Sequence, residues 1–166
     1  MQKDLALLLE QTIQKEHMNL LELPDLEANE FPRGPASWSP KQELGHLIDS
    51  AANNHIRFVR AALEGEFHGP GYAQDDWVHI HGYQNMPWEA IVGLWLQYNS
   101  LLARLVARIP GSRMQTQSFI GSAAPVTLAF LIEDYVVHMR HHIDHLLRRE
   151  KITTYPQATT HVASET

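Results

Sequence analysis

Apolar side chains recur at helical spacing in four stretches of the chain. In the first stretch they are Leu5, Leu8, Leu9, Ile13, Leu20 and Leu21. Because residues three and four apart share one face of a helix, this spacing predicts an amphipathic helix over about residues 2–22. Pro24 ends it, and the proline-rich segment 24–35 is typical of an irregular connection.

The second stretch opens with a strong helix-start signal. Ser39 offers a hydroxyl at the N-cap, Pro40 stands at the first helical position and Gln42 at the third. This is the pattern of a capping box, in which side chains satisfy the free backbone amides of the first turn. The pattern predicts a second helix over about residues 40–64.

Two more helices follow after long connections. Residues 65–86 contain four glycines among aromatic and histidine residues, which indicates a long ordered loop. Apolar spacing then predicts a third helix over residues 88–109, ended by Pro110 and Gly111, and one extended piece between Ser112 and Pro125. Thr127 is the predicted cap of a last helix that runs to about Glu150.

Four long amphipathic helices favour an all-α four-helix bundle, because each must bury one apolar face against the others. The chain of 166 residues fits one domain at roughly 150 residues per domain. We assign that domain to residues 1–152 and a polar, fraying tail to residues 153–166. The long connections allow crossovers, so helix spacing alone leaves the topology open.

Composition narrows the class of function. The net charge of −6 opposes a nucleic-acid backbone or an anionic membrane surface. No apolar run approaches the roughly 20 residues that span a bilayer, and the amino terminus lacks the pattern of a signal peptide. We therefore expect a cytoplasmic protein without nucleic-acid or membrane partners.

The absence of cysteine excludes disulfides, thiolate nucleophiles and cysteine-containing metal sites. Any metal must be held by nitrogen and oxygen atoms. The 11 histidines then become the chemical feature to explain.

The last predicted helix carries His138, His141, His142 and His145 within eight residues. His138 and His142 lie one turn apart on one stripe, so their rings can converge on one ion. Asp134, one turn earlier, is placed to accept a ring N–H from a ligand. A hydrated, proton-titrating surface stripe is the alternative. Met139 follows His138 where His-Glu-x-x-His metalloproteases carry glutamate, so that class is excluded.

Two histidines need a third ligand from elsewhere in the fold. The candidates are His46, His55, His68, His79 and His81. The helical wheel places His55 in the apolar face of the second helix, which is typical of a core histidine. It places His46 on a polar stripe with Asp49, whose simplest interpretation is a solvated surface.

Two further polar residues are candidates for supporting roles. Asp49 follows His46 by one turn and is the candidate general base, with a solvated acid as the alternative. Asn99 interrupts the apolar stripe of the third helix, where it is either a hydrogen-bonding partner of the site or a buried structural amide.

Nearly the whole chain resembles the DinB/YfiT-like superfamily of metal-dependent enzymes. The matching stretches are Trp38 to Ser50, Asp76-Trp77 to Trp88, Trp95 with Asn99, and Asp134-Tyr135 through His138 and His142. The resemblance implies an up-down-down-up bundle, often dimeric. It also implies that His46, His138 and His142 bind a divalent metal, with water completing the coordination sphere.

The family includes hydrolases and enzymes that use low-molecular-weight thiols for S-transfer or isomerisation. We therefore expect a metal-dependent hydrolase or thiol S-transferase that acts on a small-molecule electrophile and forms a homodimer. Zinc and nickel are the expected metals among those that accept imidazole. Bound water or a thiolate taken from solution would be the nucleophile. The alternatives are a noncatalytic metal-binding or dimerisation bundle and a metal-free pH sensor.

Overall fold

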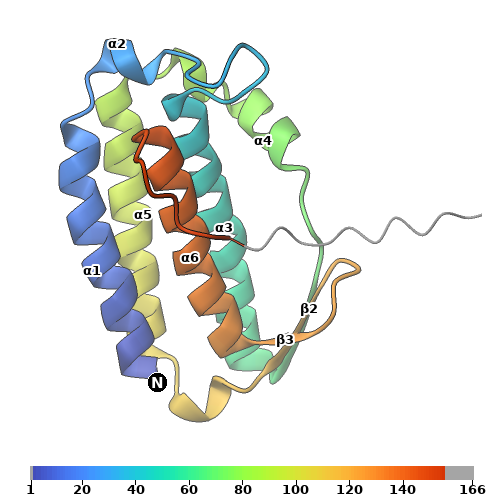
Figure 1. The fold of residues 1–166 in the computed structure, drawn as a ribbon. Coiled ribbons are helices and arrows are strands. Elements are labelled where there is room, and N and C mark those ends of the chain that lie inside the picture. Colours follow the sequence, from blue (N-terminus) through green and yellow to red (C-terminus); the bar gives the residue numbers. More distant parts are fainter. Residues whose placement is uncertain (1, 156–166) are drawn as a thin grey trace, which may run out of the picture.

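The computed structural model describes residues 2–155. Its main elements are four long helices: α1 (Gln2–Leu21), α3 (Pro40–Glu64), α5 (Trp88–Arg108) and α6 (Leu128–Leu146). They pack side by side, so the predicted four-helix bundle is confirmed (Figure 1). Helix α6 ends four residues before the predicted Glu150, because the chain turns there and folds back.

Contacts at the helix ends set the direction of α1 and α5. The Gln2 side chain at the start of α1 donates to the carbonyl of Val106 near the end of α5 (3.2 Å). The Trp88 indole at the start of α5 donates to the carbonyl of Leu20 near the end of α1 (2.9 Å). Each helix begins where the other ends, so α1 and α5 are antiparallel.

Helix α6 runs in the same direction as α1. Arg140 donates to the hydroxyl of Thr12 (2.8 Å), and Arg149, just beyond α6, pairs with Glu16 one turn later on α1 (2.6 Å). Helix α3 is antiparallel to α6 and parallel to α5 (Figure 1). In chain order the four long helices therefore run up, down, down and up.

The capping signal at residue 39 sets the start of α3. The backbone amide of Gln42 donates to the Ser39 hydroxyl (3.2 Å), and the amide of Ser39 donates to the Gln42 side chain (3.0 Å). At the other end Gly65 adopts a positive φ of 82°, which a residue without Cβ accepts easily. These caps hold α3 in the register that carries His46.

The hydrophobic core lies between the four long helices. Its largest fully buried side chains include Leu9, Leu44, Phe58, Trp95, Leu102 and Ile132. The polar stripe of α3 is buried as well, since His46, Asp49 and Ser50 are each at most 3% exposed. The interpretation of this stripe as a solvated surface is therefore wrong: contacts from α6 and from residues 72–83 cover it.

The predicted loop 65–86 is ordered, but it contains regular structure. It holds strand β1 (Glu66–Gly69), helix α4 (Gln74–His81) and a 3-10 turn at Tyr83–Asn85. The segment predicted to be irregular near residue 25 likewise contains a short helix, α2 (Asp25–Ala28). Both α2 and α4 are shorter than the windows in which apolar periodicity becomes visible.

A small sheet lies beside the bundle, near the end where α3 stops and α6 begins (Figure 1). Strand β2 (Gln117–Ile120) pairs in parallel with β1, with Ser118 opposite Phe67, and pairs antiparallel with β3 (Val126–Thr127). The extended piece predicted between Ser112 and Pro125 is strand β2, and the short strand β3 follows that range directly before α6. A 3-10 turn at Gly111–Arg113 precedes them.

The chain after α6 folds back along that helix. The amide of Thr153 donates to Asp144 (2.8 Å), and the hydroxyl of Tyr155 donates to Asp134 (3.0 Å). The first residues of the predicted tail therefore pack against the bundle. The remainder of that tail, residues 156–166, lies outside the described residues.

By length and composition, helix α5 could cross a membrane, with a mean hydropathy of 1.2 over its most apolar window. In this fold its Trp95, Leu102 and Val106 are fully buried in the bundle core. A core helix of a globular protein passes the same test, so this helix is weak evidence for a membrane span.

Candidate metal centre

Three histidines from two helices meet near one end of the bundle. His46 comes from α3, and His138 and His142 come from successive turns of α6. One nitrogen from each ring lies within 4.8 Å of the other two. The ring centroids are 4.5–5.0 Å apart. The structure thus brings together the three side chains that the family resemblance singled out.

The surroundings keep two of these rings neutral. His46 is 1% exposed, and burial together with the nearby His142 lowers its pKa to about 3. Burial, and then the neighbouring histidines, likewise place the pKa of His138 well below its ordinary value. A neutral imidazole has a free lone pair on one nitrogen, which is the form that a metal requires.

The donor atoms themselves fit a divalent metal. Nε2 of His46 faces Nε2 of His138 at 3.1 Å, while Nδ1 of His46 is buried without a hydrogen-bond partner among the described residues. Nε2 is thus the nitrogen of His46 that faces the cluster. Three imidazoles converging in this way match the nitrogen donor set of zinc and of other borderline metals.

Glu43 orients His142 and was not found by the sequence reasoning. Nδ1 of His142 donates to Oε1 of this 2%-exposed carboxylate (3.0 Å), which leaves Nε2 of His142 to face the cluster. Arg33 donates to the other oxygen of Glu43 (2.9 Å). The carboxylate–histidine pair fixes the tautomer of His142, as carboxylates commonly do for metal-binding histidines.

Trp38 covers one side of the cluster. The centroid of its ring lies 4.9 Å from that of His46 and 6.3 Å from that of His142. Because Trp38 directly precedes the N-cap Ser39, the capping box that starts α3 also positions this ring. The indole excludes water from that side of the three histidines.

A cavity of about 530 Å³ opens beside the cluster, and His46 and His138 form part of its wall. This volume lies within the range of small-molecule sites. Further along α3 the wall continues with Ser50, Asn54 and Arg57, and α6 contributes Asp134 and Tyr135. Tyr155, from the segment that folds back after α6, completes this side.

The other histidines lie outside the cluster. Nδ1 of His55 is 3.4 Å from the hydroxyl of Tyr98, as expected of a half-buried core histidine. His141 contacts the carbonyl of Thr153 (2.7 Å), and Nδ1 of His145 lies 3.8 Å from Glu43. The remaining candidates are on β1 and α4, where His68 stacks on Phe119, His79 is exposed and His81 contacts Asp49.

Two predicted supporting residues have partners other than the three histidines. Asp134 accepts from the Tyr155 hydroxyl, and the Tyr155 ring packs edge-on against His138 (5.1 Å between centroids). Asn99 is fully buried, donates to the carbonyl of Trp95 (2.8 Å) and accepts from the hydroxyl of Tyr135. Asn99 therefore has the contacts of a structural amide.

Asp49 faces α4 and the turn that follows it. Its Oδ1 accepts from the Tyr83 hydroxyl (2.7 Å) and lies 3.0 Å from Nδ1 of His81, while its Oδ2 is buried without a partner among residues 2–155. Burial raises the pKa of Asp49 above its ordinary value. Its contacts form a Tyr83–Asp49–His81 chain, and a role as general base stays a prediction.

Sequence signals for the residues that were missed are weak. Glu43 stands at the position after the capping-box glutamine, where an acid normally favours the helix dipole. Tyr155 lies in a stretch that reads as a polar tail. Their roles depend on contacts with residues 99 and 21 positions away in the chain.

No protein-family model and no curated protein matches the sequence. Two solved structures match the fold. The first is YfiT from Bacillus subtilis, described as a probable metal-dependent hydrolase with an unusual four-helix bundle topology. It is 20% identical, the match covers 89% of this chain and 84% of that chain, and the TM-score is 0.76.

The second is a mutant of the mycothiol-dependent maleylpyruvate isomerase. It is 11% identical with a TM-score of 0.73, and the match covers 88% of this chain but 60% of that longer chain. At these identities the likeness establishes the fold, which is the one the sequence motifs predict. The chain has the DinB/YfiT-like fold.

Proposed function

We propose that this protein is a metal-dependent enzyme whose divalent ion is held by His46, His138 and His142. The observation that carries the proposal is the convergence of three nitrogen donors within 4.8 Å of one another. A ligand-sized cavity beside them would admit a substrate. The two structural neighbours, a probable metal-dependent hydrolase and a thiol-dependent isomerase, support the same conclusion.

The side chains around the cluster prepare it for this role. Glu43 holds the proton of His142 on Nδ1, and burial keeps His46 and His138 unprotonated. Trp38 excludes water from one side, whereas the cavity leaves the other side accessible. A divalent ion at three imidazoles supplies Lewis acidity, which activates a nucleophile such as water or a thiol.

The substrate of the proposed reaction is a small-molecule electrophile. Hydrolysis would use water, and the transfer reaction would use a low-molecular-weight thiol taken from solution, because the chain has no cysteine. A thiol has a free pKa of about 8.5 and needs less help from a general base than water does. The open cavity favours either reaction over the alternative of a noncatalytic metal-binding bundle.

The first experiment measures the metal content of untagged protein, purified without added metal, by mass spectrometry. We expect near-stoichiometric divalent metal in the wild type and none in His138→Ala or His142→Ala. His141→Ala is the matched control on the same helix face and should retain the metal. Stoichiometric metal in His138→Ala would overturn the ligand assignment.

The second experiment tests catalysis. Metal-loaded protein is incubated with a panel of electrophiles, such as activated esters and epoxides, with and without added thiols. Turnover that requires both metal and His138 supports the enzyme, and the dependence on thiol separates transfer from hydrolysis. Bound metal without turnover of any electrophile would favour the noncatalytic bundle.

Other properties stay predictions. Zinc and nickel are the proposed metals, since both accept imidazole ligands. Homodimerisation is what the family resemblance implies, and a cytoplasmic location without nucleic-acid or membrane partners is what composition and charge predict.

A further inference from the structure

The cavity beside the histidines contains a second polar feature that the proposed metal chemistry does not use. His46, Ser50, Asn54 and Arg57 follow one stripe of α3 and all line the cavity. Arg57 lies eleven positions after His46, which places the two roughly 16 Å apart along the helix axis. The histidines and the guanidinium therefore belong to different parts of one cavity.

Arg57 lacks an anionic partner within residues 2–155. Its guanidinium makes two long contacts with neutral acceptors, at 3.5 Å to the side chain of Asn54 and 3.4 Å to the carbonyl of Pro70. By contrast, Arg60, one turn later and turned to the surface, forms a two-point pair with Glu64 (2.7 and 3.0 Å). The half-buried Arg57 thus retains unused donors in a geometry that suits a carboxylate.

Tyr72 adds a hydrogen-bond donor to the wall that holds Arg57. Tyr72 lines the same cavity as Arg57, and burial raises the pKa of its phenol to about 12, so it keeps its proton at neutral pH. The hydroxyl of Tyr155, also in this wall, is already donated to Asp134. The neutral phenol of Tyr72 can donate to an oxygen of an anionic guest, which favours such a guest beside the cation.

The one carboxylate of the described cavity lining stands nearer to the histidines. Asp134 is one turn before His138, about 6 Å along α6. It already accepts from Tyr155, and burial raises its pKa. Asp134 therefore leaves the guanidinium without an ion-pair partner.

Most of the remaining wall is apolar, with Gln74 and Ser118 as its polar members. Strands β2 and β3, the turn between them and the start of α6 supply Ile120, Ala123, Ala124, Val126, Phe130 and Leu131. A guest that fits this cavity has a hydrocarbon middle. One end of this guest would lie at the guanidinium of Arg57 and the other end at the histidines.

We propose that Arg57 is the carboxylate-binding residue of the substrate site, so that the substrate is an organic acid with an apolar spacer between its carboxylate and its electrophilic centre. This inference rests on the proposed function for its reacting end. The spacing of His46 and Arg57 along α3 excludes very short acids, whose carboxylate and reacting atom are adjacent.

The test uses hexanoate as the probe and its neutral isostere hexanamide as the comparison, in ligand-detected NMR titrations of the full chain as purified. We expect hexanoate to bind the wild type about tenfold or more tightly than hexanamide, because a charged hydrogen-bonded pair is lost with the amide. Arg57→Met should weaken hexanoate binding by a similar factor and leave hexanamide binding unchanged. Arg57→Lys keeps the charge but loses the two-point geometry of the guanidinium. Its affinity for hexanoate should lie between those of the wild type and Arg57→Met.

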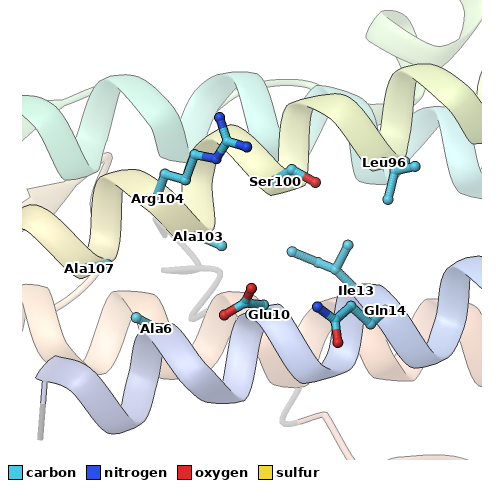
Figure 2. Close-up of a pocket in the computed structure, with 9 residues that line it drawn as sticks. All are labelled: Ala6, Glu10, Ile13, Gln14, Leu96, Ser100, Ala103, Arg104 and Ala107. Atoms are coloured by element: carbon cyan, nitrogen blue, oxygen red, sulfur yellow. The ribbon is translucent and has the colours of Figure 1, made fainter.

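Arg104→Met is the matched control. Arg104 lies in a second hollow of about 240 Å³ between α1 and α5, shown in Figure 2 with Glu10 on the facing helix. Arg104 is not part of the wall of the cavity beside the histidines, so we expect wild-type hexanoate affinity in this variant. Hexanoate binding that is lost in Arg104→Met, or that is unaffected by Arg57→Met, would overturn the proposal.

Metal content measured on the same samples separates the two proposals. A metal-free wild type that still shows Arg57-dependent hexanoate binding refutes the proposed metal enzyme and keeps the carboxylate site. Stoichiometric metal with binding indifferent to Arg57 refutes the carboxylate site alone. Binding that disappears in His142→Ala while Arg57 is intact assigns the carboxylate to the metal and overturns this inference. Thermal melting of each variant checks that it is folded.

Discussion

At the scale of single residues, the candidate centre depends on one buried carboxylate. Glu43 contacts Arg33, His142 and, at longer range, His145. The ion pair with Arg33 offsets the cost of burying the negative charge of Glu43. The hydrogen bond from His142 to the same carboxylate fixes the tautomer of that ring. A residue that touches no substrate thus controls the direction of one donor lone pair.

Replacing Glu43 by glutamine should therefore weaken metal binding without removing a ligand. We expect the Kd for zinc to rise about 10–100-fold, because an amide accepts the Nδ1 proton of His142 less strongly than a carboxylate does. Competition with a chromophoric chelator measures this affinity. His145→Gln, which alters the longer contact to the same carboxylate, is the control and should raise the Kd for zinc less than Glu43→Gln does. An unchanged Kd in Glu43→Gln would remove Glu43 from the proposed centre.

At the scale of elements, α3 organises the site because different stripes of one helix meet different neighbours. The stripe of Gly45 and Asp49 faces Tyr83, and the stripe of His46 and Ser50 faces the cavity. The first stripe allows close approach only because residue 45 has no Cβ, since a Cβ there would overlap the Tyr83 ring. Tyr83 cannot easily move, as its hydroxyl is held by Asp49.

Two glycine-to-alanine substitutions in helices should have opposite effects. Gly45→Ala should destabilise the protein by about 1–3 kcal/mol through the clash with Tyr83. Gly93→Ala, on α5 with open space around the new methyl group, should stabilise it by about 0.5–1 kcal/mol. Urea denaturation measures both free energies. Equal effects of the two changes would contradict the close packing of α3 against Tyr83.

At the scale of the whole molecule, an ion-pair network joins the two ends of the described chain. Arg149, beyond α6, pairs with Glu16 of α1 (2.6 Å) and with Asp144 (2.7 Å). Burial by itself raises the pKa of Glu16, but hydrogen bonds from Arg149 and Asn19 outweigh it, so the pKa lies below the ordinary 4.5. The network ties α1 to the segment that carries Tyr155 over the cavity.

This network should make the fold sensitive to acid. Below pH 4.5 the unfolded chain takes up a proton at Glu16 that the folded chain still excludes. The free energy of unfolding therefore decreases as the pH is lowered. The slope from this one group is at most about 1.4 kcal/mol per pH unit, and the contribution is complete above pH 4.5. Denaturation at several pH values should show a shallower acid slope in Glu16→Gln than in the wild type. Glu10→Gln, at an exposed position of α1, should keep the wild-type slope.

Local sequence determined the elements and part of the site. Apolar spacing placed the four long helices, and Ser39, Pro40 and Gln42 marked the start of α3, because periodicity and capping act within a few residues of the chain. The same locality put His138 and His142 on one stripe of α6. The identity of the third histidine required the family motif, since the helical wheel left His46 and His55 open.

Tertiary structure decided what the polar stripes face. Only packing against α6 turned the His46 stripe into a buried wall, and only the return of the chain after α6 brought Tyr155 to the cavity. The pairing of β1 with β2 joins residues about 50 positions apart, and Glu43 meets His142 across 99 positions. Such contacts leave no local pattern, because their free energy comes from surfaces that meet only when the helices assemble.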